Sequence, residues 1–261
     1  MFNSQLLKSF VNHRLKAKTR HGVHSPFVYN LIDKVIYDFK PKPEYESIEL
    51  LRKGLLADNQ EISITDLGAG SHVNNNKKKR VSQLAKNALK PQNLAQLIYR
   101  LANAAKPKNI IELGTCLGLT TSYLAKAAPW ACITTIEGCN ETAALAKENF
   151  EKLQLSNVDL LVGNFDQLLP GVIEKTDSLD FVFVDGNHRK DATLNYFKWC
   201  LPKVHNETLI IFDDIYWSKG MKEAWEEIKS HPQVTVTIDL FWIGLVYFKK
   251  GQEKEHFRIK F

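Results

Sequence analysis

The chain has 261 residues, of which 44% are hydrophobic and 25% charged, and its formal net charge is +6 at pH 7. These proportions are ordinary for a soluble globular protein, and the length suits one large domain or a domain with a helical extension. No apolar run approaches the roughly 20 residues that span a bilayer, and the first residues lack the apolar core of a signal peptide. We therefore expect a cytoplasmic protein with no membrane partner.

The positive charge is concentrated in the first part of the chain. Residues 1–100 contain 17 Lys and Arg against 8 Asp and Glu, whereas residues 101–261 contain 18 against 21. This basic part could attract RNA or an acidic substrate, or it could simply be a solvated surface that favours solubility. The four cysteines form no C-x-x-C pair, so we interpret them as reduced packing residues and not as a zinc or disulfide framework.

The first hundred residues have a mainly helical pattern. Ser25 followed by Pro26 is typical of a helix start. The expected elements are a basic amphipathic helix over Phe2–Leu15, a helix from Pro26 to about Tyr37, a helix over Tyr45–Leu56, a strand and glycine turn over Ile62–Ser71, an exposed loop over Asn74–Arg80, and helix with breaks over Val81–Ala104. The turn Asp66–Gly70 is either an alternative cofactor loop, a flap near the active site or a structural turn.

From about residue 108 the pattern alternates between strand and helix. The expected strands are Asn109–Leu113, Ala131–Glu137, Val158–Val162, Leu179–Val184 and Leu209–Phe212, and the expected helices are Leu119–Ala128, Asn140–Leu153 (with Asn140 as its cap), Gln167–Glu174, Asp191–Leu201 and Gly220–Ser230. Such alternation predicts an α/β fold with a doubly wound, mostly parallel sheet. Two last strands, Val234–Phe241 and Leu245–Phe248, flank Gly244 and predict a hairpin, so one late strand should be antiparallel.

The most informative segment is Ile110–Thr121, with the sequence I-I-E-L-G-T-C-L-G-L-T-T. A short apolar run ends at Glu112, a glycine turn follows, and a helix begins. The next apolar run ends at the acidic residue Glu137. This layout suits a nucleoside cofactor, because backbone approaches it at the glycines and a carboxylate takes the ribose hydroxyls. A carboxylate at Glu112 would repel a pyrophosphate but attract a sulfonium group.

The string E-L-G-T-x-x-G-x-T-T resembles motif I of class I S-adenosylmethionine-dependent methyltransferases, especially the catechol-O-methyltransferase-like group. The resemblance implies a Rossmann-like sheet of seven strands with S-adenosylmethionine at the carboxyl ends of the strands. It also implies that Asn164 stands where the family usually has Asp, beside the adenine. The implied cofactor-binding residues are Glu112, Gly114, Thr115, Gly118, Thr120, Glu137, Gly138, Asn164, Phe165 and Asp185.

Three further carboxylates follow two buried strands. Asp185 ends one strand, and Asp213 and Asp214 end the next. Like charges so close favour a bound cation or a raised pKa. The resemblance implies that these three residues bind Mg²⁺ or another divalent cation, which would favour the ionised form of a substrate hydroxyl. The alternative is that they cap turns and hold the cofactor without a metal.

His188 lies in the string D-G-N-H, directly after Asp185. The catechol-specific pattern has Lys at this position, and D-G-x-H is closer to broader small-molecule and sugar-modifying methyltransferases. An imidazole with a pKa near neutrality suits a general base, so we expect His188 and Asp185 to be catalytic. A structural role for His188 is the alternative.

Together these patterns predict a basic, largely helical extension or lid over residues 1–80 and a methyltransferase domain over residues 81–261. The expected activity is methyl transfer from S-adenosylmethionine to an oxygen nucleophile of a small molecule, with help from a divalent cation, in a chain whose helical extension could mediate a homodimer. One alternative is a nucleic-acid methyltransferase that uses the basic part, although the N/D-P-P-Y-type motif is missing. Another is a non-catalytic protein that keeps the cofactor fold.

Overall fold

The computed structural model describes residues 4–65 and 78–261 and has the predicted α/β architecture with mostly parallel strands. The chain forms two compact units: one contains the described residues up to Asp38 together with Ile173–Phe261, and the other is Phe39–Val172. The predicted turn Asp66–Gly70 lies outside the described residues. The predicted division of the chain at residue 80 stays a prediction.

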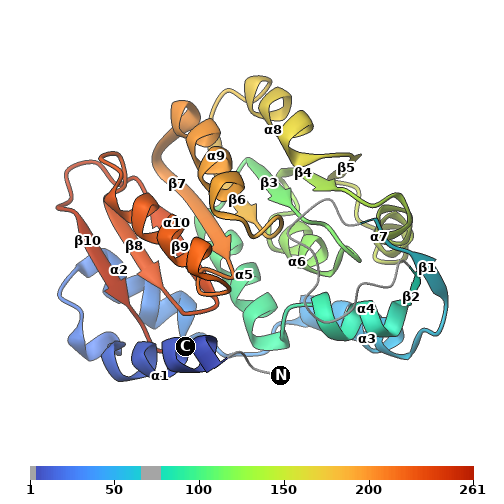
Figure 1. Cartoon of the computed structure of the whole chain (residues 1–261), viewed down its shortest axis with the longest axis horizontal. Helices are drawn as coiled ribbons and strands as arrows, with labels where there is room; N and C mark the ends of the chain where they lie inside the picture. Colours follow the sequence, from blue (N-terminus) through green and yellow to red (C-terminus); the bar gives the residue numbers. More distant parts are fainter. Residues whose placement is uncertain (1–3, 66–77) are drawn as a thin grey trace. The chain divides into compact units, whose positions relative to one another are not determined.

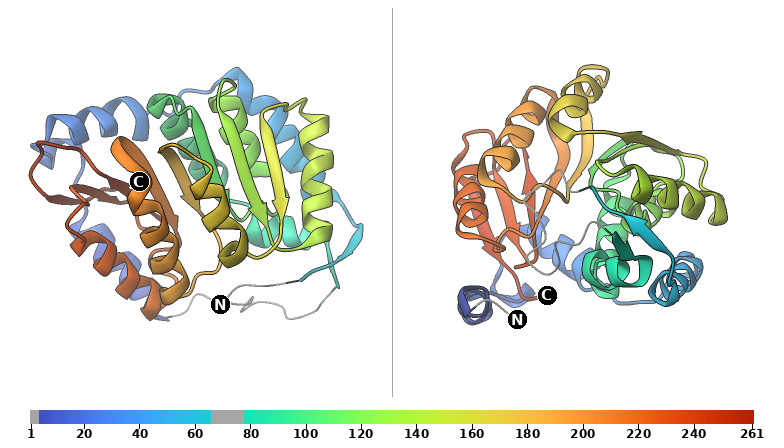
Figure 2. Two further views of the ribbon diagram at one scale, coloured as in Figure 1. Left: turned by 90° about the horizontal axis from the view of Figure 1, so that it is seen from above. Right: turned by 45° about the vertical axis from the view of Figure 1, so that its right-hand side comes forward.

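The unit Phe39–Val172 is built on three parallel strands, β3 (Asn109–Leu113), β4 (Cys132–Glu137) and β5 (Val158–Val162), which run side by side in Figure 2. The apolar residues of β3 and the isoleucines of β4 are buried because helices cover parallel sheets, whereas the apolar residues of β5 are half-buried or exposed. Its helices are α3 (Pro43–Ala57), α4 (Val81–Ala88), α5 (Gln92–Ala105), α6 (Leu119–Ala127), α7 (Asn140–Lys152) and the first part of α8 (Phe165–Glu174). Cys139, and not Asn140, is the N-cap of α7, so that detail of the prediction was wrong.

A short antiparallel ribbon precedes α4. Its strands are β1 (Glu61–Ser63) and β2 (Lys78–Arg80), and Glu61 lies opposite Arg80. The prediction of an exposed loop was therefore wrong for Lys78–Arg80. Opposite charges on facing positions favour the pairing of two strands. The run of basic residues Lys78–Arg80 gave no sign of its pairing partner, β1, which lies earlier in the chain.

The other unit has five strands among its described residues: β6 (Leu179–Val184), β7 (Val204–Asp213), β8 (Val236–Asp239), β9 (Ile243–Tyr247) and β10 (Glu255–Arg258). Their order is β10-β8-β9-β7-β6. The predicted hairpin is confirmed, since β9 is antiparallel to both β7 and β8. The strand β10, which pairs parallel to β8, was not predicted.

The helices of this unit include α9 (Lys190–Cys200) and α10 (Lys219–Ser230), which pack against each other (Figure 1), and the N-terminal helices α1 (Ser4–Lys16) and α2 (Pro26–Leu31). The cap of α2 is as predicted, because the Ser25 side chain accepts from the Val28 N–H. Helix α2 continues into a π-helical turn, Ile32–Ile36. Among the described residues, no helix is both long enough and apolar enough to cross a bilayer.

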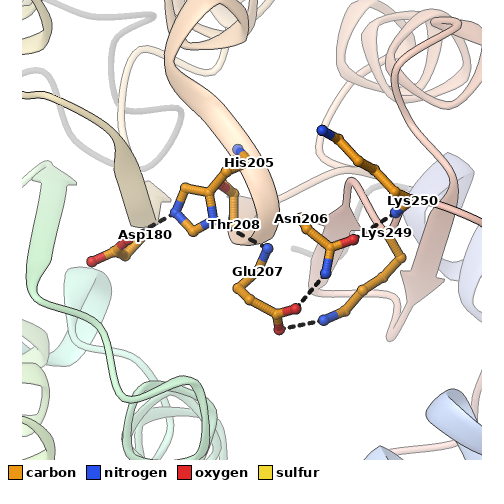
Figure 3. A network of polar contacts seen from close by, with 7 residues as sticks. All are labelled: Asp180, His205, Asn206, Glu207, Thr208, Lys249 and Lys250. Atoms are coloured by element: carbon orange, nitrogen blue, oxygen red, sulfur yellow. Dashed lines mark hydrogen bonds and ion pairs between the residues drawn. The ribbon is translucent and has the colours of Figure 1, made fainter.

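A polar network fixes the beginning of β7 (Figure 3). His205 Nε2 lies 2.8 Å from Asp180 Oδ1 on β6, and Glu207 forms an ion pair with Lys249 beyond β9. The hydrogen bond from Lys249 is the main reason that the pKa of Glu207 lies below its ordinary value. The pairing of β6 with β7 shifts register between Leu179 and Phe181. The network therefore ties β7 to both neighbours where the regular pairing is interrupted.

Gly244 permits close packing between β9 and α10. A Cβ atom there would lie 2.6 Å from two ring atoms of Trp225, a side chain that is 2% exposed. We expect Gly244→Ala to lower the free energy of unfolding by about 1–3 kcal/mol, because the buried ring must shift. Gly54 in α3 has open space at its Cβ position, so Gly54→Ala should instead stabilise by about 0.5–1 kcal/mol. Urea unfolding of both variants would check this, and equal midpoints would contradict it.

Candidate functional site

The predicted cofactor residues of the unit Phe39–Val172 gather at the carboxyl ends of β3 and β4. Glu112, in β3, is completely buried, and its Oε2 accepts hydrogen bonds from the hydroxyls of Thr121 and Thr135, the latter at 2.7 Å. Thr135 Oγ1 also lies 2.6 Å from Thr115 Oγ1. A buried carboxylate requires such donors. The three threonines therefore connect the glycine turn, the first turn of α6 and β4 through one carboxylate.

The glycines of the turn are required by backbone geometry. Gly114 has φ 98° and Gly118 has φ 76°, a region in which only glycine is comfortable. A Cβ at Gly118 would lie 2.5 Å from an atom of the Phe150 ring in α7. Gly118 is the N-cap of α6, and Thr120 lies in the first turn of that helix. The backbone of the turn is thus packed closely against α7.

Glu137, at the end of β4, joins the two loops. Its Oε2 accepts from the Cys116 N–H at 2.7 Å, and its Oε1 accepts from the Cys139 N–H at 2.9 Å. Each carboxylate oxygen has a second lone pair, and the half-buried position of Glu137 and Gly138 leaves them accessible. The carboxylate is therefore held in a fixed orientation while it keeps capacity to accept hydroxyl groups.

Asn164 and Phe165 follow β5. Asn164 Oδ1 accepts from the Asp166 N–H at 2.8 Å, and its backbone carbonyl accepts from the Gln167 and Leu168 N–H groups. The Asn164 carbonyl oxygen therefore accepts the first hydrogen bonds of helix α8. Its side-chain amide and the half-buried ring of Phe165 can still contact a base, but the structure gives Asn164 a capping role that the sequence comparison did not suggest.

The ribbon strand β1 is attached beside Glu137. The Ser63 N–H donates to Glu141 Oε2 at 2.6 Å, and the Thr65 N–H lies 3.4 Å from the Cys139 sulfur. Cys139 is 3% exposed and is one of four free cysteines. Cys139 thus has the predicted packing role, whereas Cys132 is exposed and does not. Residues at the beginning of α7 therefore donate to the Glu137 carboxylate and accept from the end of β1.

The acidic residues of the other unit also gather. Asp185, His188 and Asp213 each offer a ligand atom, and these three atoms lie within 4.8 Å of one another. His188 Nε2 lies 3.9 Å from oxygens of both Asp185 and Asp214. The structure therefore brings together all four residues that the sequence singled out at this sheet edge. The group of three includes His188 in place of Asp214, which differs from the predicted ligand set.

The loops that carry these residues have constrained backbones. Asn187 and Asp214 have φ 51° and 52°, a region that Asn and Asp adopt more readily than most residues. The Asn187 amide donates to the Tyr196 hydroxyl at 2.9 Å, and the Asp214 N–H donates to the Trp242 carbonyl at 2.7 Å. The acidic loops are therefore fixed by α9 and by the hairpin turn.

Asp239, which the sequence analysis missed, links several elements of the same unit. It is 5% exposed; its Oδ1 lies 3.1 Å from His13 Nε2 and its Oδ2 accepts from the Tyr216 hydroxyl at 2.6 Å. Burial alone would raise the pKa of Asp239, but the hydrogen bonds from His13, Tyr216 and the Phe241 N–H outweigh burial and lower it. Asp239 thereby fixes α1 and the segment after Asp214.

The sequence contains only a faint signal for these missed residues. His13 occupies the same helix face as Ser9 and Ala17, which points to a buried position. Its partner Asp239 is 226 residues away, and no local pattern connects them. Thr121 is part of the quoted motif and Thr135 lies in the predicted strand Ala131–Glu137, but their hydroxyls could be assigned to Glu112 only from the structure.

Comparisons with known proteins agree with this geometry. Residues 111–215 match a family model described as a methyltransferase domain. This segment contains the glycine turn, Glu137 and all four residues of the acidic cluster, so the predicted resemblance to class I S-adenosylmethionine-dependent methyltransferases is confirmed over it.

Two relatives and one solved structure illustrate the similarity. A catechol O-methyltransferase of Niastella koreensis is 32% identical over 47% of this chain and 56% of its own length, and one of Mycobacterium tuberculosis is 26% identical over 46% and 54%. The chain thus matches only about half the length of these curated relatives. An O-methyltransferase from Bacillus cereus, solved in complex with SAH, has a TM-score of 0.56 at 20% identity over 81% of this chain and 93% of its own. That likeness confirms the predicted fold.

We expect Asp239→Asn to lower the free energy of unfolding by about 1–3 kcal/mol at pH 7, because it removes the charge that His13 and Tyr216 contact. The folded-state pKa of Asp239 is below its ordinary value, so its contribution is complete above the unfolded pKa of about 4 and is lost as the pH falls through the folded pKa. Urea unfolding at pH 7, 5 and 3.5 should show the difference from wild type shrinking. A difference that grows toward low pH would contradict this. Glu148→Gln, which affects an exposed pair with Lys152, is the control.

Proposed function

We propose that this protein is an S-adenosylmethionine-dependent methyltransferase that acts on an oxygen nucleophile of a small molecule. The observation that carries the proposal is the Glu137 carboxylate, oriented by the Cys116 and Cys139 N–H groups directly beside the glycine turn. A carboxylate in this position suits the two ribose hydroxyls of an adenosine group. The O-methyltransferase names of the relatives support the same reaction.

The cofactor assignment also rests on Glu112. A buried negative charge at the beginning of the turn disfavours the phosphates of a dinucleotide and favours the positive methionine part of S-adenosylmethionine. Gly114, Thr115, Gly118 and Thr120 would shape the turn around the cofactor. Gly138, Asn164 and Phe165 would contact the adenosine.

We further propose that Asp185, His188 and Asp213 bind a divalent cation. The donor set fits, since two carboxylates and one imidazole converge within 4.8 Å. A site with an imidazole among carboxylates suits Mn²⁺ better than Mg²⁺, because Mg²⁺ prefers oxygen ligands alone. When bound, the cation would lower the pKa of an acceptor hydroxyl. Asp214, whose Oδ2 lies 3.9 Å from His188 Nε2, would add a third carboxylate beside the cation.

A general-base role for His188 is the alternative within the same reaction. The imidazole lies between two carboxylates that would stabilise its protonated form after it takes a proton. One nitrogen atom of His188 cannot bind a cation and accept a proton at the same time. Removal of the metal by a chelator distinguishes the two roles, because a general base does not need a metal. The small-molecule acceptor is common to both.

Glu137→Gln should weaken the binding of S-adenosylhomocysteine about 5- to 150-fold, because it removes the charge from hydrogen bonds worth roughly 1–3 kcal/mol. Isothermal titration calorimetry would measure the affinity. The control Glu148→Gln, on the exposed side of helix α7, which follows Glu137 in the chain, should bind as the wild type does. If wild type binds no S-adenosylhomocysteine, the proposed activity is wrong; if Glu137→Gln binds normally while wild type binds, only the role of Glu137 is wrong.

Asp185→Asn should lower the affinity for Mn²⁺ by at least about tenfold, since it removes one of two anionic ligands. Mn²⁺ titration followed by electron paramagnetic resonance would report this without any acceptor. Asp180→Asn, at the beginning of β6, is a matched control that should leave Mn²⁺ affinity unchanged. Absence of Mn²⁺ binding to wild type, with full methyl transfer in chelator, would reject the cation and favour His188 as a base.

A further inference from the structure

The N-terminal helix α1 presents an apolar stripe on its outer face. Leu7, Val11 and Leu15 are spaced by four residues and are 53%, 49% and 80% exposed. Residues with this spacing lie on one face of a helix. The stripe consequently runs along the whole of α1, which is drawn in dark blue in Figure 1.

The opposite face of α1 is fixed to its own unit. His13 is 1% exposed and contacts Asp239, and the Ser9 hydroxyl accepts from Lys222 at 2.6 Å. The backbone after the helix pairs with the last strand region, since Lys18 N–H donates to the Arg258 carbonyl at 2.8 Å. Because α1 already packs on its own unit through the opposite face, the apolar stripe is not needed to hold the helix there.

Positive charges flank the stripe on both sides. At 100° per residue, Lys8 lies beside one edge of the stripe and Arg14 beside the other, and α1 contains no acidic residue. Two aromatic rings continue the apolar surface: Phe10 is 36% exposed, and its ring centroid is 6.5 Å from that of Trp242, which is also 36% exposed. Leucine and aromatic residues bordered by Lys and Arg are the composition of helices that lie in a lipid interface.

We propose that α1 binds this protein to the surface of an anionic lipid bilayer, with the helix parallel to the surface. The side chains of Leu7, Val11 and Leu15 would enter the region of the lipid headgroups, while Lys8 and Arg14 would reach the lipid phosphates. This inference goes beyond the proposed methyl transfer and does not depend on it, and it departs from the expectation, drawn from the sequence, that the protein has no membrane partner.

The charges of α1 argue against a second copy of the chain as the partner. An antiparallel pair of α1 helices related by a two-fold axis at Val11 would place Leu7 opposite Leu15. It would also bring each edge of the stripe against the same edge of the partner helix, so that Lys8 meets the partner's Lys8 and Arg14 meets the partner's Arg14. Facing positive charges would repel each other. A single convex ridge about 20 Å long also offers less than the roughly 800 Å² per partner of a standard protein interface, whereas a lipid surface requires no matching shape.

The test is co-sedimentation of the full chain with vesicles of phosphatidylcholine alone and with one quarter phosphatidylglycerol. We expect binding to the anionic vesicles, at least about tenfold weaker binding to the neutral ones, and loss of binding as the salt concentration rises. The double variant Leu7→Ser with Leu15→Ser should lower the affinity for anionic vesicles at least about tenfold. The single variant Lys8→Gln should lower it less.

The matched control is Leu50→Ser with Leu56→Ser on α3, since these leucines are 70% and 45% exposed but carry no role in the proposal. This control should bind vesicles as wild type does. Circular dichroism and S-adenosylhomocysteine titration would show that each variant is folded. The proposal is overturned by no vesicle binding, by equal binding to neutral vesicles, by binding that survives the α1 substitutions, or by light scattering that shows a dimer dependent on Leu7 and Leu15.

Discussion

The buried carboxylate of Glu112 is the constraint on which the glycine turn depends. A charge that is completely excluded from water must be compensated by donors at fixed positions. Here the donors are the hydroxyls of Thr121 on α6 and Thr135 on β4. The neighbouring strand and the first turn of the following helix are therefore positioned by one side chain, and the backbone between Gly114 and Gly118 has little freedom.

The same principle is repeated at Glu137, with a different outcome. Its carboxylate is only half buried, and its donors are backbone N–H groups of the two loops that flank it. Backbone donors hold the carboxylate without occupying every lone pair. Glu112 thus organises the interior of the turn, whereas Glu137 on the neighbouring strand is held in place with part of its accepting capacity still available.

The sequence predicted the fold well wherever local pattern and tertiary packing agree. The bounds of β3, β5 and β6 are the expected ones, because each strand is a short, mostly apolar run of the kind found in parallel sheets. The strands β2 and β10 were missed because they are short, polar and stabilised by partners distant in sequence. For the site, the sequence indicated which side chains follow each strand. It did not indicate that His188 would take the place of Asp214 beside Asp185 and Asp213, or that Asp239 would contact a histidine from α1.

The N-terminal helix shows how one element can serve two surfaces. Its inner face supplies His13 to Asp239, whose other oxygen holds Tyr216, two residues after Asp214. Its outer face carries the exposed leucines and the flanking cations. A helix fixed this firmly loses little conformational entropy when its outer face binds a surface, because the cost of ordering it has been met by the fold. The Lys and Arg residues of α1 are only a small part of the basic excess of the first hundred residues, so the proposed role of α1 leaves the rest of that excess as solvated surface.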